Sequence, residues 1–152
     1  MAAEIRRKHS IHEYALFAEA WFFLAVSRIL IFFVPFKKLL PILGRQLNNI
    51  EAEKAASKPG TSPVFLKMIQ ISILRAASRS PWRTKCFEQA LAARMMLKKR
   101  KMESVIYFGL NKNLFNAQKE ESAAHAWIVC SGFTITGGRN NKMFTIVGRF
   151  AV

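Results

Sequence analysis

The sequence contains no aspartate, because all nine acidic residues are glutamates, against 24 lysines and arginines. This absence excludes a catalytic triad built on aspartate. The formal net charge of +15 is large for 152 residues. Such an excess favours a polyanionic partner, which could be nucleic acid, an anionic membrane surface, or an acidic peptide or protein.

Cysteine is also scarce, with only Cys86 and Cys130 in the chain. Two cysteines cannot build a disulfide framework, so this usage is typical of a reducing cytoplasm. A chain of this length can bury a hydrophobic core without disulfide bonds. We expect one domain of ordinary size, or a small core with a helical extension.

The apolar N-terminal segment lacks a long uncharged run, because Glu19 and Arg28 interrupt it. A membrane-spanning helix needs about 18 or more apolar residues with few charges. Early glutamates and the lack of a small-residue cleavage site disfavour a signal peptide. We therefore expect a helix over residues 13–36, ending before Pro41, that is buried or covered by a partner. A membrane-surface or membrane-embedded helix is the alternative.

Metal and cofactor motifs are missing as well. His9 and His12 lie three residues apart and could face one metal ion, but two ligands make no site. No phosphate-binding loop of the P-loop type occurs. The sequence therefore predicts neither a metal nor a bound cofactor.

A polar segment after Gly44 divides the chain. It can begin as a helix, but Pro59, Gly60 and Pro63 end that helix and mark a linker. We expect an N-terminal helical segment and linker over residues 1–62, and a second unit over residues 63–152. The second unit carries most of the excess charge, net +11 against net +4.

The second unit is expected to be α+β. Apolar periodicity predicts helices over residues 64–78 and from Thr84, a plausible N-cap, to Lys99. Residues 111–122 are polar and read as a loop. Alternating β-branched and aromatic residues predict an antiparallel meander. Its four strands are expected over residues 104–110, 124–130, 133–136 and 143–150.

Cys86 falls in the first turn of the second predicted helix, where the helix dipole, Arg83 and Lys85 favour the thiolate. His125 follows 39 residues later on a predicted strand. Brought together, the two would form a nucleophile and its base. Either residue alone is more typical of a buried core position than of a catalytic one. Strand alternation places Cys130 on the face opposite His125, so we expect Cys130 in the core.

Several short motifs carry a family resemblance. They are Trp82-x3-Cys86, Ala90-Leu-Ala, Met96-Leu-Lys-Lys-Arg100, Phe108-Gly109, Ala124-His-Ala-Trp127 and Gly132. Their order resembles the transglutaminase-like core of lasso-peptide biosynthesis B proteins over roughly residues 64–150. These proteins are cysteine peptidases that remove the leader from a lasso-peptide precursor. The N-terminal segment, with Arg28, Pro35-Phe36 and Leu39-Leu40, is similar to the helical lead-in of the stand-alone form.

The resemblance implies a papain-like cysteine peptidase core in which Cys86 is the nucleophile and His125 the base. The backbone N–H of Cys86 would donate to the oxyanion, with the Trp82 indole as a second candidate donor. Residues 1–62 show no strand pattern, so leader recognition is expected from a separate protein. A lasso cyclase would take the cut core peptide. In family members whose leader-recognition domain is fused to the peptidase, the cleavage step is linked to ATP, so the resemblance implies such a link for cleavage here.

The third catalytic position departs from the family pattern. Many members have an aspartate about twelve residues after the histidine, where this chain has Gly137. Asn140 or Asn141 is expected to substitute first, then Glu120 or Glu121. A backbone carbonyl or a simple Cys–His dyad would also serve.

Two rival functions remain. A non-catalytic basic module that binds nucleic acid or anionic lipid would explain the charge. The peptidase hypothesis, in contrast, predicts no nucleic-acid partner. A transglutaminase-like acyltransferase would use the same thioester and deliver the acyl group to an amine.

Overall fold

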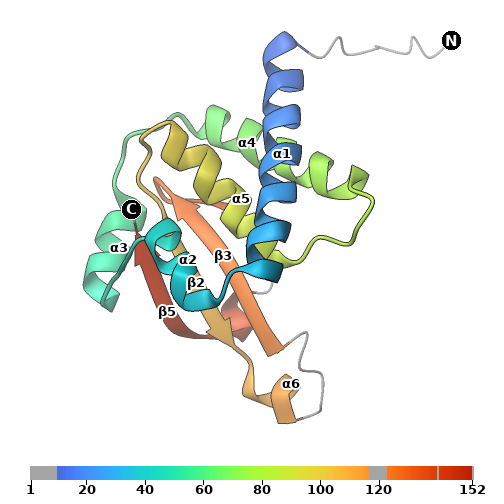
Figure 1. The fold of residues 1–152 in the computed structure, drawn as a ribbon. Coiled ribbons are helices and arrows are strands. Elements are labelled where there is room, and N and C mark those ends of the chain that lie inside the picture. The colour runs from blue at the N-terminus through green and yellow to red at the C-terminus, as the bar shows by residue number, and fades with distance from the viewer. Residues whose placement is uncertain (1–9, 117–122, 140, 152) are drawn as a thin grey trace, which may run out of the picture.

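The computed structural model describes residues 10–116, 123–139 and 141–151 (Figure 1). The elements are α1 (Ile11–Phe33), α2 (Phe36–Leu43), β1 (Arg45–Gln46), α3 (Asn49–Ser57), α4 (Pro63–Arg79), α5 (Cys86–Lys99), β2 (Val105–Leu110), α6 (Lys112–Asn116), β3 (Ala124–Cys130), β4 (Phe133–Thr136), η1 (Asn141–Met143) and β5 (Thr145–Ala151). The predicted α+β class and the predicted bounds of β3 and β4 match this arrangement.

The five strands form one antiparallel sheet in the order β1-β5-β2-β3-β4. The predicted meander is therefore wrong in its last strand, because β5 returns to pair with β2. One physical reason is that α4 covers the outer side of β4. The Gln70 side-chain amide donates to the carbonyls of Thr134 and Ile135, both at 3.1 Å. These bonds occupy acceptors that another strand would need.

Helices cover both faces of the sheet. On one face, α4 and α5 pack on Ile106, Ile128 and Cys130 in the main core. On the other, α3 packs through Ala52 and Ala56 against Tyr107 and Trp127. Alternate residues of each strand thus enter different cores, as strand geometry requires. Cys130 is buried in the main core, as the strand pattern predicted.

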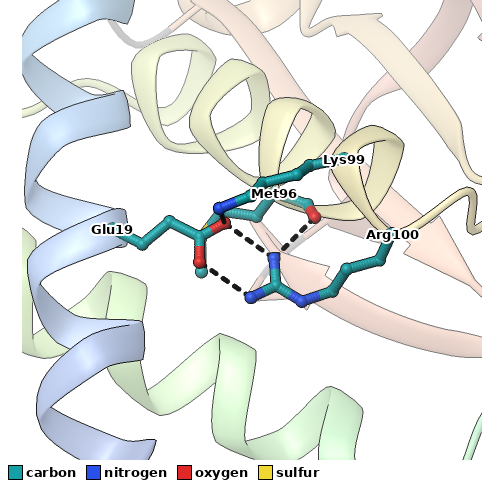
Figure 2. A network of polar contacts seen from close by, with 4 residues as sticks. All are labelled: Glu19, Met96, Lys99 and Arg100. Atoms are coloured by element: carbon teal, nitrogen blue, oxygen red, sulfur yellow. Dashed lines mark hydrogen bonds and ion pairs between the residues drawn. The ribbon is translucent and has the colours of Figure 1, made fainter.

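The inner face of α1 packs on α4 and α5 through Leu16, Ala20, Leu24 and Ser27 (Figure 1). The two charges that interrupt its apolar sequence both pair with α5. Glu19 accepts two hydrogen bonds of 2.7 Å from the Arg100 guanidinium (Figure 2). Arg28 Nη1 lies 2.7 Å from Glu88 Oε1. By length and composition alone, α1 is also apolar enough to cross a membrane.

Buried Arg94 fixes α5 above the sheet. Its guanidinium donates to the Ser104 carbonyl at 2.7 Å, the Ser104 hydroxyl at 3.0 Å and the Phe150 carbonyl at 2.6 Å. Burial lowers the pKa of Arg94 to about 10. The side chain therefore joins the middle of α5 to the start of β2 and the end of β5.

The polar segment before Pro59 begins as a helix, as the sequence allowed, because α3 starts with a capping box between Asn48 and Glu51. Other predicted boundaries are wrong. Pro41, expected to lie beyond the end of a helix, is inside α2. The N-terminal segment, expected to contain no strand, contributes β1 to the edge of the sheet. Thr84 is not the N-cap of α5, because Lys85 takes that position. The Thr84 hydroxyl instead accepts a hydrogen bond of 3.0 Å from the Gln89 side chain. The polar loop after β2 contains the short helix α6.

Candidate active site

Cys86 is the first residue of α5, after a connection that ends α4 sharply. Ser80 caps the end of α4, and Pro81 cannot continue the helix. Lys85 has an extended backbone, with φ −91° and ψ 162°, and is the N-cap of α5. The N–H groups of a first helical turn have no acceptor within the helix. The Cys86 thiol lies among them and accepts a hydrogen bond from the Phe87 N–H.

His125 is the second residue of β3, which lies between β2 and β4 in the sheet. It pairs across the ladder with Gly109 of β2. Its side chain is half-buried. The β2 ladder therefore fixes the backbone that carries the imidazole, whereas the ladder to β4 begins three residues later, at Ile128.

The fold brings Cys86 and His125 together, and a hydrogen-bond interaction between the two side chains shifts the pKa of each. The Cys86 sulfur also accepts from the backbone N–H of Ala126, the residue after His125. The start of α5 is thus joined to β3 by both a side-chain and a main-chain contact. This geometry lets the imidazole take a proton from the thiol.

A backbone carbonyl holds the other side of the His125 ring. His125 Nε2 lies 2.7 Å from the carbonyl oxygen of Gly137. A carbonyl oxygen can only accept, so Nε2 carries the hydrogen and donates it. Nδ1 is then the ring nitrogen that faces the thiol. The carbonyl selects the tautomer, a task that an aspartate performs in many catalytic triads.

Gly137 can take this position because it has no side chain. Its φ is +72°, in the left-handed region that favours glycine. A Cβ atom there would lie 2.4 Å from the Ala126 carbonyl oxygen and 2.8 Å from Trp127 Cβ. The turn after β4 therefore approaches β3 closely enough for its own carbonyl to reach the imidazole.

Two aromatic rings pack against the imidazole of His125. The Trp127 ring lies 5.7 Å from it and nearly parallel, at 26°. The Phe144 ring lies 4.9 Å away. Gly109 makes room for both, because a Cβ there would be 2.6 Å from Phe144 Cβ and 3.0 Å from Trp127 Cζ3. The rings restrict rotation of the imidazole and shield one side of it from water.

The contacts favour a thiolate paired with an imidazolium. Burial raises the pKa of the Cys86 thiol, but the bonds from His125, Ala126 and Phe87 outweigh burial and leave that pKa below its usual value. The bond to Cys86 raises the pKa of His125; burial opposes this, and the Gly137 carbonyl adds to the rise. Each partner therefore stabilises the charged form of the other.

The other predicted site residues lie apart from this contact or outside the described residues. Trp82 packs against Trp21 at 6.0 Å between ring centroids. Its Nε1 is buried without a hydrogen-bond partner among the residues that the structure describes. Its role as an oxyanion donor stays a prediction.

Asn141 lies in η1, where it lines a groove with Trp127 and Phe144. Within the described ranges the ring acceptor of His125 is the Gly137 carbonyl, and no hydrogen bond joins Asn141 to His125. Asn140, Glu120, Glu121 and His9 lie outside the described residues.

In the part of the chain that the structure describes, no three His, Cys, Asp or Glu side chains gather to hold a metal ion. Glu88, two residues after Cys86, is only 2% exposed, and its carboxylate pairs with Arg28.

Sequence reasoning included a backbone carbonyl among the options for the third group but did not identify Gly137. The available signal was the Gly137-Gly138 pair directly after a predicted strand, because paired glycines permit a close backbone approach. The contribution of Phe144 had no such signal, since a phenylalanine before a strand is typical of any core.

The sequence matches one known family, described as Transglutaminase-like superfamily, over residues 30–149. Comparison with curated proteins and with solved structures gave no match. Members of this superfamily are typically cysteine-dependent enzymes. The matched region contains the start of α5, β3 and the turn after β4, which together form the site. The chain therefore belongs to the transglutaminase-like superfamily.

Proposed function

We propose that this protein is a cysteine peptidase that removes the leader from a lasso-peptide precursor in the cytoplasm. The observation that carries the chemistry is the hydrogen bond between Cys86 and His125, with the imidazole held by the Gly137 carbonyl. The choice of substrate rests on the resemblance of the motifs from Trp82 to Gly132 to the stand-alone B proteins.

In the first half of the reaction, the Cys86 thiolate attacks the carbonyl carbon of the scissile peptide bond. The negative charge that develops on the carbonyl oxygen needs N–H donors. The backbone N–H of Cys86 is one, because it belongs to the first turn of α5. His125 then protonates the leaving amine as the C–N bond breaks, which leaves a thioester on Cys86.

In the second half, His125 removes a proton from water, and the hydroxide attacks the thioester carbonyl. The C–S bond breaks, Cys86 is restored as thiolate, and the leader leaves as a carboxylate. Water enters as the only co-reactant. The resemblance implies a separate leader-recognition protein upstream and an ATP-using cyclase downstream. It also implies a dependence of cleavage on ATP, which assays with and without the nucleotide test.

Cleavage by purified variants tests the catalytic assignment. The protein, its recognition partner and the precursor are incubated together, and products are identified by mass spectrometry. We expect Cys86→Ala and His125→Ala each to abolish cleavage. Cys130→Ala is the matched control, since Cys130 is a core cysteine and should leave cleavage in place. Normal cleavage by either site variant would overturn the assignment.

An acyltransferase is the second candidate, because the superfamily is compatible with either activity. The two reactions share the thioester and differ only in what attacks it. Adding an amine acceptor to the assay separates them. A peptidase yields the free acid whether or not the amine is present, whereas an acyltransferase yields the amine adduct.

A further inference from the structure

The outer face of α1 is an exposed apolar stripe. Its largest members are Ile11, Tyr14, Trp21, Phe22, Ile29, Phe32 and Phe33, all classed as exposed large hydrophobic residues. They recur three, four or seven residues apart along α1, which places them on one side of the helix. Ala15 and Ala18, also exposed, lie between them. Phe36, at the start of α2, extends the stripe and is also exposed.

Polar groups of α1 make contacts within the protein, and the Arg28 guanidinium also lies over the Phe32 ring of the stripe, 4.7 Å from its centroid. Glu19 and Arg28 both pair with α5, and buried Ser27 lies on the inner face. Both the inner and the outer side of α1 are therefore largely apolar. Glu19 docks the helix to Arg100 (Figure 2). An exposed apolar patch of this length is uncommon on a monomeric soluble protein and marks an interaction surface.

Basic residues lie directly beyond the stripe. Lys37 and Lys38 follow Phe36 in α2, and both are exposed. In the sequence, Arg6, Arg7 and Lys8 come just before α1. Aromatic and aliphatic side chains with lysine or arginine beside them are typical of helices that lie in the interface of an anionic membrane.

We propose that the outer stripe of α1, with Phe36, Lys37 and Lys38, docks the protein on an anionic lipid bilayer. The helix lies in the plane of the interface, so that Phe22, Phe32 and Phe33 enter the acyl region and the lysines contact lipid phosphates. The domain behind α1 supplies the polar side that an isolated interfacial helix would need. A spanning orientation would break the pairs that Glu19 and Arg28 form with α5.

Charge favours the membrane over a second copy of the chain. The net charge of +15 makes two copies repel each other, whereas an anionic surface attracts them. The proposal does not rest on the peptidase activity, so Cys86→Ala should bind vesicles as the wild type does.

Vesicle flotation with the full chain tests the proposal. The vesicles are neutral phosphatidylcholine, and phosphatidylcholine mixed with anionic phosphatidylglycerol. We expect binding to the anionic vesicles, weaker by about tenfold or more on neutral ones and at high salt. Lys37→Glu with Lys38→Glu should reduce anionic binding by a similar factor.

The decisive variant is Phe22→Ser with Phe33→Ser, at positions 58% and 80% exposed. We expect it to lose vesicle binding by at least about tenfold, because the stripe supplies the insertion energy. The control is Val64→Ser with Val147→Ser, on α4 and β5, at positions 71% and 56% exposed. It removes exposed apolar groups elsewhere and should bind as the wild type does.

Trp21 provides a second readout that needs no destabilising variant. Lipids brominated in the acyl chain should quench the tryptophan emission of the wild type, and Trp21→Phe should remove most of that quenching. Three outcomes overturn the proposal. They are absence of wild-type binding and quenching, unchanged binding of the Phe22→Ser/Phe33→Ser variant, and a wild-type dimer in solution that this variant dissociates.

Discussion

Replacing Gly137 with alanine should disturb the candidate active site through the backbone alone. The added methyl group would meet the Ala126 carbonyl oxygen at 2.4 Å. Because that neighbour is backbone, the turn after β4 must move away. The Gly137 carbonyl then moves with it and withdraws from the His125 ring.

The expected size of the effect comes from two contributions. An alanine at φ +72° is strained by about 1–2 kcal/mol relative to glycine. The clash with β3 adds about 1–3 kcal/mol, as overpacking does elsewhere. Gly132 provides a matched control, because its φ is +76° and nothing lies within 4 Å of the position of its Cβ. Gly132→Ala has the strain without the clash.

Urea unfolding and the pH dependence of thiol alkylation measure these effects. We expect Gly137→Ala to be less stable than Gly132→Ala by about 1–3 kcal/mol. Losing the Gly137 carbonyl lowers the pKa of His125, which weakens the pair and raises the pKa of Cys86. Alkylation of Cys86 should therefore shift to higher pH in Gly137→Ala and stay unchanged in Gly132→Ala.

Mass spectrometry separates Cys86 from buried Cys130, which should react slowly in both variants. Equal stability and equal alkylation profiles for the two alanine variants would refute the reasoning. Such a result would mean that the Gly137 carbonyl neither limits the space beside β3 nor supports the imidazole.

Two further predictions concern stability. The hydrogen bond from Arg100 lowers the pKa of Glu19, although burial opposes the shift. The pKa of Glu19 is thus lower in the folded than in the unfolded protein. The contribution of the Glu19–Arg100 pair to stability is therefore present near neutral pH and is lost on acidification. Glu19→Gln should lower the free energy of unfolding, measured in urea, by about 1–2 kcal/mol near neutral pH and leave it unchanged in acid. Exposed Glu53→Gln is the control. A loss of stability that persists in acid would contradict the assignment. Arg94→Leu leaves the Ser104 and Phe150 carbonyls without their partner. It should therefore lower the free energy of unfolding by about 2–5 kcal/mol in the same measurement. Exposed Lys98→Ala should change this free energy little, and an equally small effect of Arg94→Leu would contradict the structural role of Arg94.

Local sequence patterns were enough for the individual helices and strands. Alternation of apolar residues placed β3 and β4 at their observed bounds, and it placed Cys130 in the core. Proline, which acts within a few positions along the chain, gave both ends of α4, at Pro63 and before Pro81, but Pro41 lies inside α2 and did not end it. The start of α5 shows the limit of this reasoning, since Thr84 has the side chain of an N-cap but bonds to Gln89 instead.

Contacts between distant residues could not be read from such patterns. β5 pairs with β2 and not with β4, whose backbone instead accepts two hydrogen bonds from Gln70 of α4, more than sixty positions away. The pairing of Glu19 and Arg28 with α5 likewise appeared in the sequence only as two interruptions of an apolar run.

The candidate site divides in the same way. The sequence alone was sufficient to name Cys86 and His125 as candidates, from their places in a first helical turn and on a strand together with the order of the motifs around them. It also excluded an aspartate as the third group, because the chain has none. Only the tertiary structure decided which acceptor holds the imidazole. A backbone carbonyl is present at every residue, so it becomes distinctive only when the fold brings one, here that of Gly137, within 2.7 Å of His125 Nε2.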